Sequence, residues 1–477
     1  MNPLKLQDVL AGTGGELRGA LPERTVFPRI ERDSRRAASG DLFIAIRGEQ
    51  HDGHHFVADA AAAGATAALV GRDWADARVE LPLPLIVVDE PVAALQRLAA
   101  YWRDRHDLTV VGITGSVGKT STKEVVAAVL GGKFRTYRSP GNLNNEIGLP
   151  LSLLEIGPET EAVVLEMGGA YALGELTLLS RIARQKISVV TNVFPVHLER
   201  MGSIEAIAET KAELVDAVPP DGVAVLNGDD PRVRAMAARC RGRVLTYGMG
   251  KDNDVRADQV STEALEGTSF RLHLEGETFH IRIPLIGGHA VELALAGIAV
   301  GHAMGMHIAE MLVGLKDPSI QVRLLIVPGP NGSRLIDDTY NASTPSVLSA
   351  LGLLDALRPR RAIAVLGDMR ELGSVSEEEH RVVGRRAAEV VDVLVTYGDL
   401  ALTIAREALG GGQDVDAPRP DVTSFGLGQR EELIAYLQRE LRDGDVVLLK
   451  GSRGLRMEEM VAALRADGEP TGAGLGE

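Results

Sequence analysis

Apolar runs that alternate with amphipathic segments organise the central part of the chain. Residues 110–130 read as an apolar run, a glycine-punctuated turn and an amphipathic segment, which predicts a strand, a loop and a helix. Further apolar runs at 162–165, 187–190 and 223–226 each end abruptly in polar residues. Strands that alternate with helices predict a mainly parallel sheet, whose ligands bind at the carboxyl ends of the strands. We therefore expect these polar strand ends to surround the loop at 114–120.

The first hundred residues predict a smaller α/β domain. Short apolar runs lie on both sides of an alanine-rich helical stretch at 56–63. The runs are 42–46, 66–70 and 85–88. By composition, the polar clusters at 33–35 and 48–54 are predicted to be solvated loops.

The last third of the chain predicts a second nucleotide-fold-like sheet without a phosphate loop of its own. Its apolar runs again lead into polar residues, at 362–366, 393–396 and 446–449. Between 251 and 286 the pattern is alternating and charge-rich, which predicts an antiparallel edge or small subsheet. The predicted fold class is α/β with three domains. They are a small α/β N-terminal domain at 1–105, a central P-loop ATPase-like domain with a mostly parallel sheet at 106–315, and a C-terminal Rossmann-like domain at 316–465, before a disordered tail at 466–477.

Composition and charge narrow the class of protein. The chain has 477 residues, 45% of them hydrophobic and 25% charged, which are ordinary values for a globular protein. A net charge of -15 argues against nucleic-acid binding, which needs a basic face. Cys240 is the only cysteine, so no internal disulfide and no cysteine-based metal site is expected. Without a secretion signal or an apolar stretch of roughly 20 residues, we expect a cytoplasmic protein that does not insert into membranes.

The loop at 114–120 carries the parts of a phosphate-binding site. Gly115 and Gly118 let the backbone approach an oxyanion, Lys119 supplies positive charge, and Thr120 can ligate Mg²⁺. The strict motif has glycine five residues before Gly118, where this chain has Ile113. The alternative is a glycine-rich turn that leads into an ordinary helix.

Three polar residues near the predicted strand ends are candidates for the same site. Glu166 could complete a Mg²⁺ shell with phosphate oxygens and Thr120, or be solvated. His197 follows another strand end, although a packed or surface histidine is the more frequent outcome. Lys211 lies in a charged helical stretch and, by pattern alone, is a surface lysine.

Two further polar segments could bind ligand. The stretch 141–148 concentrates the amides Asn142, Asn144 and Asn145, which suit a polar ligand or a tight turn. The segment 337–341 could hold a ribose hydroxyl and stack a base, or simply cap a helix.

One ordered set of motifs runs through nearly the whole chain, from about Asp33 to Glu458. It comprises 114–120, 141–148, Glu166-Met167-Gly168, His197-Leu198-Glu199, Tyr340-Asn341-Ala342, 366–369 and Lys450-Gly451-Ser452-Arg453. In order and spacing these motifs resemble the Mur ligase family. Within that family, Asn142-Leu143-Asn144-Asn145 and the closing Lys-Gly-Ser-Arg are most similar to the ligases that add D-alanyl-D-alanine.

The resemblance implies metal and nucleotide roles for the matching residues. Glu166 and Thr120 would bind one Mg²⁺, His197 would bind a second near the substrate carboxylate, and Lys211 would be the lysine that is often carbamylated in such ligases. Lys119, His197 and Lys211 form the implied catalytic set. The implied ATP contacts are Gly115, Ser116, Val117, Gly118, Lys119, Thr120, Ser121, Arg323 and Asp338.

The resemblance also implies the substrates and the reaction. ATP would phosphorylate the carboxylate of UDP-N-acetylmuramoyl-tripeptide, and the amine of D-alanyl-D-alanine would attack the acyl phosphate. This would be the last cytoplasmic step in the synthesis of the peptidoglycan precursor, and we expect a monomeric enzyme. The implied substrate contacts are Ser34, Arg35, Asn142, Asn145, Tyr340, Asn341, Lys450 and Arg453.

Several positions depart from the family pattern. Ala290 and Leu293 stand where the family has asparagine, and Phe194 and Val322 stand where it has glycine. These departures keep an inactive, nucleotide-binding relative open as an alternative. The ligase that adds the third peptide residue and a folate-polyglutamylating relative are the other two. The sequence leaves open whether that third residue is lysine or diaminopimelate.

Overall fold

The structure is a computed structural model that describes residues 3–48, 51–77, 80, 82–169, 172–196, 198–263, 267–286, 288–317, 325–357, 359–410 and 419–466. The chain divides into two compact units. Unit 1 comprises Met1–Thr191, Ala208–Thr246 and Ala296–Gly314, and unit 2 comprises Asn192–Ile207, Tyr247–Leu295 and Leu315–Glu477.

Unit 1 begins with a five-stranded sheet of order β2-β7-β6-β5-β4, in which only β2 is antiparallel to its neighbour. Helices α2 and α3 pack on one face, while α1 and α4 pack on the other. The strands are β1 (Leu4–Lys5), β2 (Glu16–Arg18), β3 (Val26–Phe27), β4 (Ile30–Glu31), β5 (Leu42–Ile44), β6 (Ala67–Gly71) and β7 (Leu85–Val88). The helices are α1 (Leu6–Thr13), η1 (Ser34–Arg36), η2 (Gly53–Phe56), α2 (Val57–Ala62), α3 (Arg72–Asp76) and α4 (Pro91–Asp104).

The polar turn at 48–54 is more ordered than its composition predicts. His54 is only 2% exposed, because its ring nitrogens bond to the Asp52 carboxylate at 2.6 Å and to the Gly71 amide at 2.9 Å. The prediction of a fully solvated loop was therefore wrong for His54. Its two polar partners lie elsewhere along the folded backbone, so the sequence pattern does not reveal them.

The central sheet has the order β16-β15-β14-β13-β12-β11-β8-β10-β9. Strand β8 pairs in parallel with β10 on one side and β11 on the other, so the chain reverses its direction of winding at β8. Such a switch point is where parallel sheets bind ligands. The strands of unit 1 are β8 (Thr109–Thr114), β9 (Thr136–Arg138), β10 (Ala162–Glu166), β11 (Ile187–Val190), β12 (Val223–Asn227) and β13 (Arg243–Gly248), the last of which continues into unit 2.

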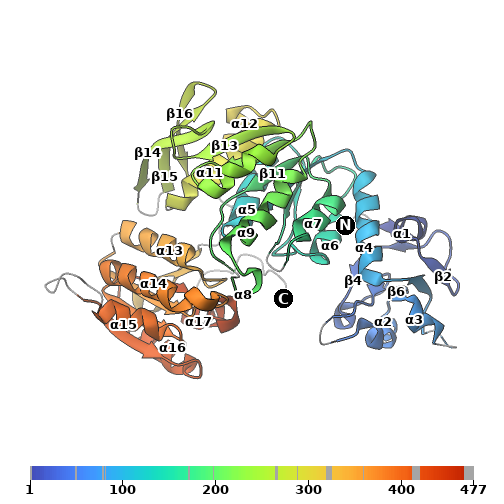
Figure 1. Cartoon of the computed structure of the whole chain (residues 1–477). Coiled ribbons are helices and arrows are strands. Elements are labelled where there is room, and N and C mark those ends of the chain that lie inside the picture. Colours follow the sequence, from blue (N-terminus) through green and yellow to red (C-terminus); the bar gives the residue numbers. More distant parts are fainter. Residues whose placement is uncertain are drawn as a thin grey trace. The chain divides into compact units, whose positions relative to one another are not determined.

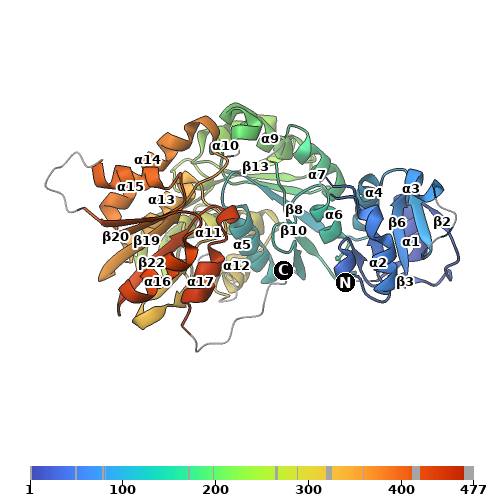
Figure 2. The ribbon, with the colours of Figure 1, turned by 90° about the horizontal axis from the view of Figure 1, so that it is seen from below.

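Helices cover both faces of this sheet, as the alternating pattern predicted. Figure 2 shows α6 and α7 beside β8 and β10. The helices are α5 (Lys119–Gly131), α6 (Gly148–Leu153), α7 (Glu175–Ala183), α9 (Ile204–Asp216), α10 (Pro231–Ala235), η3 (Met236–Arg239), α11 (Gly288–Ala303) and α12 (Ile308–Leu315).

Helix α4 joins the two sheets of unit 1 through one hydrophobic core. Figure 1 shows α4 between α1 and the pair α6 and α7. Leu95, Leu98 and Trp102 of α4 lie in the same buried cluster as residues of both sheets, and the Trp102 indole donates to Ile156 O at 3.1 Å. Burial of this apolar surface stabilises both sheets together.

Unit 2 contains a β-hairpin region and a second open sheet. The strands β14 (Val255–Glu263), β15 (Gly267–Leu274) and β16 (Glu277–Ile283) pair antiparallel, as the alternating pattern predicted. The second sheet has the order β17-β18-β22-β19-β20-β21 and is parallel except for β17. Its strands are β17 (Leu325–Pro328), β18 (Arg334–Asp337), β19 (Arg361–Gly367), β20 (Val393–Tyr397), β21 (Asp421–Phe425) and β22 (Asp445–Lys450).

Two layers of helices cover that second sheet. Helices α13 to α15 pack on one face and α16 and α17 on the other, as Figure 2 shows. The helices of unit 2 are α8 (Leu198–Met201), η4 (Pro330–Gly332), α13 (Thr344–Ala356), η5 (Gly373–Val375), α14 (Ser376–Val390), α15 (Leu402–Gly410), α16 (Arg430–Glu440), η6 (Arg453–Leu455) and α17 (Glu458–Leu464). Among the residues that the structure describes, no helix has the length and apolar character needed to cross a membrane. Nearly all of the tail predicted at 466–477 lies outside those residues.

Candidate active site

The phosphate loop lies between β8 and α5, at the switch point of the central sheet. Gly118 adopts φ +82° at the start of α5, a left-handed conformation that favours glycine. The Lys119 ammonium lies over the loop and donates to Gly115 O at 2.8 Å and to Ser116 O at 3.2 Å. The loop amides, the first turn of α5 and the lysine charge therefore gather in one place, as an anion site requires.

Neighbouring strand ends hold this loop. Thr191, which follows β11, donates from its hydroxyl to Val117 O at 2.9 Å and from its amide to Thr114 O at 3.0 Å. Asn227, at the end of β12, donates to Thr191 O at 2.9 Å. The expectation that polar strand ends surround the loop is confirmed for these residues.

Glu166, at the end of β10, is 3% exposed and is held by two side chains. The Thr120 hydroxyl donates to Glu166 Oε2 at 2.5 Å, and the Asn144 amide donates to Glu166 Oε1 at 2.8 Å. The solvated alternative for Glu166 was therefore wrong. Asn144 was not among the predicted site residues, although it lies in the amide-rich stretch that drew attention.

The other two amides of that stretch have different surroundings. Asn145 Oδ1 accepts from the amides of Ile147 and Gly148, at 3.3 and 2.8 Å, and so satisfies donors at the start of α6. Asn142 is exposed, and its carbonyl accepts from the Asn144 amide at 2.8 Å. Only Asn142 presents its side chain to solvent without a described protein partner.

Thr120 and Glu166 form a donor set that fits Mg²⁺. Both offer hard oxygen atoms, and Mg²⁺ is typically bound by one or two protein oxygens together with substrate phosphates and water. The residues that the structure describes include no cluster of three or more histidine, cysteine or acidic side chains, so no all-protein metal cage is found there. A magnesium ion that arrives with a nucleotide triphosphate would suit this arrangement.

Lys211, on α9, is buried in the central domain. It is 3% exposed and donates to Gly169 O at 2.5 Å. Burial, together with the positive charge of Lys119, lowers its pKa to about 7. The surface alternative was therefore wrong, and much of the Lys211 amine is unprotonated near neutral pH.

Glu213, two residues after Lys211, was not predicted from the sequence. Its carboxylate accepts from the Gly174 amide at 2.6 Å and from the Thr177 amide at 2.9 Å, at the start of α7. Because Lys211 and Glu213 bind on either side of the same segment, α9 holds both ends of residues 169–174.

A second group of predicted residues gathers at the strand ends of the C-terminal sheet. Lys450, at the end of β22, is 2% exposed and donates to Asp338 Oδ2 at 2.7 Å and Asn341 O at 2.9 Å. The Arg453 guanidinium lies 4.9 Å from the centre of the Tyr340 ring and donates to its hydroxyl at 3.0 Å. All five residues belong to unit 2.

His289, in the first turn of α11, lies near this group. Burial lowers its pKa, and the Asp338 carboxylate opposes that shift, which places His289 within electrostatic range of the Asp338–Lys450 pair. Its ring Nδ1 is 3.3 Å from the Ser349 hydroxyl of α13. The pair between α11 and α13 was not predicted, because it joins side chains from distant parts of the chain.

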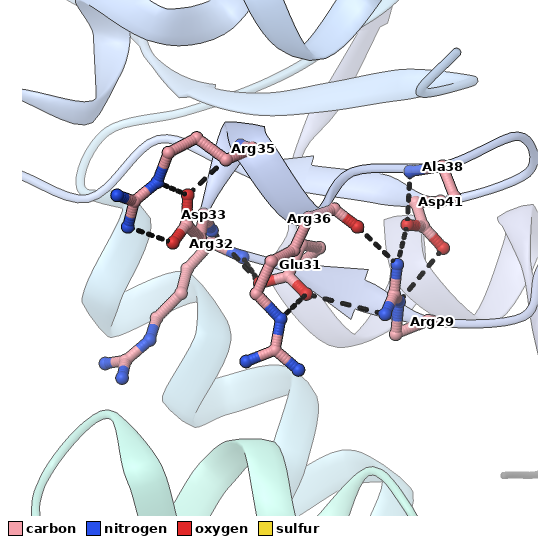
Figure 3. A network of polar contacts seen from close by, with 8 residues as sticks. All are labelled: Arg29, Glu31, Arg32, Asp33, Arg35, Arg36, Ala38 and Asp41. Carbon is pink, nitrogen blue, oxygen red and sulfur yellow. Dashed lines mark hydrogen bonds and ion pairs between the residues drawn. The ribbon is translucent and has the colours of Figure 1, made fainter. Parts of the chain in front are cut away.

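Ser34 and Arg35 lie in the first domain, on η1. Figure 3 shows that Arg35 folds onto Asp33 in a two-point ion pair, with Nε–Oδ1 at 2.9 Å and Nη2–Oδ2 at 2.6 Å. The Arg35 hydrogen bond lowers the pKa of Asp33 to about 2. Ser34 is half-buried, whereas the Arg35 side chain is 87% exposed. In the same view the Arg32 guanidinium points away from these acidic groups.

The remaining predictions divide by whether the structure describes the residue. Ser121 is half-buried in the first turn of α5. His197, Arg323 and Val322 lie outside the described residues, so their predicted roles stay predictions. Ala290 and Leu293 are 1% and 7% exposed on α11, and Phe194 is half-buried.

Three domain families match the chain in order. Residues 28–103 match the Mur ligase family, catalytic domain, residues 113–301 match the Mur ligase middle domain, and residues 322–453 match the Mur ligase, glutamate ligase domain. A Bacillus subtilis protein named UDP-N-acetylmuramoyl-tripeptide–D-alanyl-D-alanine ligase is 36% identical over 458 residues, which cover 94% of this chain and 96% of its own. The chain belongs to the Mur ligase family.

Solved structures of Mur ligases share the whole fold. Crystal structure I of MurF from Acinetobacter baumannii is 30% identical, with a TM-score of 0.85 over 97% of this chain and 98% of its own. The MurF ligase of Thermotoga maritima, crystallised in complex with ADP, is 29% identical, with a TM-score of 0.78 over 91% of this chain and 96% of its own. The three-domain α/β fold expected from the Mur ligase resemblance is confirmed.

Proposed function

We propose that this Mur ligase joins D-alanyl-D-alanine to UDP-N-acetylmuramoyl-tripeptide and forms ADP and phosphate from ATP. The similarity to ligases of that name carries the proposal, because it covers 94% of the chain and includes the domains outside the phosphate loop. The proposed domains are a UDP-substrate domain at 1–105, an ATP-binding domain at 106–315 and a ligase domain at 316–465. Because ATP is the co-substrate, we place the reaction in the cytoplasm.

The nucleotide phosphates bind to the loop of Gly115 to Ser121. The Lys119 ammonium already lies over the loop carbonyls, so a small rotation of its side chain would transfer its hydrogen bonds to phosphate oxygens. In unit 2, Asp338 is proposed to contact the ribose, together with Arg323. Lys450 holds Asp338 at 2.7 Å and so orients its carboxylate.

Magnesium is held by Thr120 and Glu166, and a second ion by His197. Its chemistry there is to neutralise the negative charges of the phosphates and of the substrate carboxylate, which must approach one another. The Glu166 carboxylate is already oriented by Asn144, so it needs no rearrangement to present an oxygen.

Lys211 is proposed to carry a carbamate. Its unprotonated amine attacks carbon dioxide, a C–N bond forms, and one proton leaves to solvent, which converts a cation into an anion. Burial of Lys211 and its pKa of about 7 support this step. The new carboxylate would lie near Lys119, whose charge already affects Lys211.

The reaction needs an activated carboxyl group. The terminal carboxylate of the tripeptide attacks the γ-phosphorus of ATP, and ADP leaves with the electrons of the broken P–O bond. The D-alanyl-D-alanine amine then attacks the acyl phosphate, and the tetrahedral intermediate collapses to an amide and phosphate. The Lys119 charge stabilises the negative charge that develops on the transferred phosphoryl group.

The peptide and nucleotide-sugar contacts are proposed for the remaining predicted residues. Ser34 and Arg35 bind the uridine diphosphate sugar, for which Arg35 exchanges its bond to Asp33 for one to the ligand. Asn142 and Asn145 lie near the phosphate and peptide. Tyr340, Asn341, Lys450 and Arg453 line the C-terminal part of the site. We propose a monomer as the active form.

A phosphate-release assay tests this proposal. We expect release only when ATP, the uridine-linked tripeptide and D-alanyl-D-alanine are all present. If another amine, such as diaminopimelate or glutamate, replaces D-alanyl-D-alanine with equal efficiency, the assignment within the family is wrong. Tight ATP binding without turnover on any tripeptide would favour the inactive relative, which the buried apolar Ala290 and Leu293 motivate.

A further inference from the structure

Lys123 is a buried lysine on α5, one turn beyond the phosphate loop. Its side chain is fully buried, and each N–H of its ammonium has an acceptor. These are Ser139 O at 2.6 Å, Gly141 O at 2.9 Å and Glu124 Oε1 at 3.3 Å. Burial of a charge is costly unless the charge is satisfied in this way. Because Glu124 also pairs with Arg138 at 2.6 Å, the backbone carbonyls are the main partners of Lys123.

Both carbonyls belong to the turn that begins the amide-rich loop. That loop contacts the end of β10 at three points. The Glu166 amide donates to Ser139 Oγ at 3.2 Å, and the Asn144 side chain donates to Glu166 Oε1 at 2.8 Å. The Gly168 amide donates to Asn144 O at 2.7 Å, an approach so close that a Cβ on Gly168 would lie 2.9 Å from that oxygen.

The contacts form a closed ring that returns to α5. Thr120 donates to Glu166 Oε2 at 2.5 Å, and Thr120 lies three residues before Lys123. Residues with this spacing share one face of a helix. The same face of α5 therefore holds the loop near its start, through Lys123, and holds the glutamate that the loop orients, through Thr120.

We propose that Lys123 is a positioning residue for magnesium–nucleotide binding. It fixes the turn at 139–141, so that Asn144 keeps Glu166 in the orientation in which Glu166 and Thr120 present their oxygens to the metal. Lys123 itself touches neither metal nor nucleotide, because its ammonium is buried and its donors are used. This inference rests on the proposed function in that Mg–ATP is the substrate.

The test measures nucleotide affinity separately from ligation. Isothermal titration calorimetry gives the Kd of a non-hydrolysable ATP analogue with Mg²⁺ and with EDTA, and the ratio of the two is the magnesium gain. We expect Lys123→Met to reduce that gain by about tenfold or more, as for the loss of residues that orient metal ligands, with the Kd in EDTA unchanged. The matched control is Lys133→Met, which removes the partly exposed ammonium that bonds Gly305 O just beyond the other end of α5.

A double-mutant cycle separates positioning from general destabilisation. Asn144→Ala should lose the same magnesium gain, and Lys123→Met/Asn144→Ala should lose no more than the larger single change, because both act through Glu166. Additive losses would overturn the proposal. Melting temperatures identify the variants that fold. If Lys123→Met does not fold, Lys123→Gln, whose shorter side chain cannot reach both carbonyls, should lose part of the gain.

The outcomes distinguish this inference from the proposed function. A wild-type magnesium gain in whichever Lys123 variant folds overturns the positioning role alone. A wild type that binds the magnesium nucleotide but makes no peptide bond with D-alanyl-D-alanine overturns the proposed function alone. A wild type without any magnesium gain overturns both.

Discussion

Removal of carbon dioxide should switch off most of the activity of this enzyme, and Lys211 should be the reason. Lys211 is 3% exposed, and burial together with the Lys119 charge lowers its pKa to about 7. At pH 8, about 90% of such amines are unprotonated, compared with about 0.3% for an ordinary lysine. The reactive form is therefore roughly 300-fold more abundant at Lys211 than at a surface lysine.

The assay compares activity in buffer depleted of carbon dioxide with activity after bicarbonate is restored. Nuclear magnetic resonance in ¹³C-bicarbonate should show one carbamate signal that is lost in Lys211→Ala. That variant should have reduced activity, partly restored by short carboxylic acids that replace the missing anion. The control is Lys186→Ala, which removes an exposed lysine paired with Asp221. Wild-type activity in Lys211→Ala without added acid, or no response to bicarbonate, would refute the carbamate.

The same pKa predicts how stability depends on pH. The folded pKa lies below the unfolded value, so the unfolded chain binds more protons between about pH 7 and pH 10.5. Stability therefore rises with pH across that window, and the cost of burying the charge is fully present below it. In carbon dioxide-free urea titrations, the free energy of unfolding should increase from pH 6.5 to pH 9 for the wild type relative to Lys211→Met. The opposite sign would contradict the burial of an unprotonated amine.

Three further substitutions test separate parts of the site. Lys119→Ala should lower kcat by at least ~10²-fold, since one electrostatic donor to the phosphoryl group is lost, whereas Lys133→Ala should have no effect; equal rates in steady-state assays would argue against the phosphate loop. Glu166→Gln should raise the Mg²⁺ concentration for half-maximal rate by about tenfold or more, and an unchanged magnesium titration would exclude it as a ligand. Lys450→Met leaves the Asp338 charge without its buried partner and should destabilise the protein by ~3 kcal/mol in urea titration; a smaller loss than 1 kcal/mol would show that the pair is solvated.

The sequence pattern was sufficient for the arrangement of the phosphate loop. An apolar strand, two glycines and an amphipathic helix are local features, and they predicted β8, the loop and α5. The polar strand ends could also be placed, because parallel strands bring their carboxyl ends to one edge of the sheet. Glu166 and Thr191 lie there for that reason.

The partners of individual side chains could not be predicted in this way. Asn142, Asn144 and Asn145 share one motif, yet only Asn144 reaches Glu166, because the path of the loop backbone decides which amide faces β10. Lys123 and Lys211 both lie on helices and resemble surface lysines in the sequence. Their burial depends on the distant carbonyls of Ser139, Gly141 and Gly169, which only the folded chain brings to them.

The central claim is that this Mur ligase forms a peptide bond between the uridine-linked tripeptide and D-alanyl-D-alanine. Mass spectrometry of the product after incubation with ATP and Mg²⁺ tests it most directly, with tripeptides that carry either lysine or diaminopimelate. We predict a uridine-linked pentapeptide whose mass equals that of the tripeptide plus D-alanyl-D-alanine less one water, formed only when ATP is present. No pentapeptide from either tripeptide, with ATP bound and intact, would contradict the account.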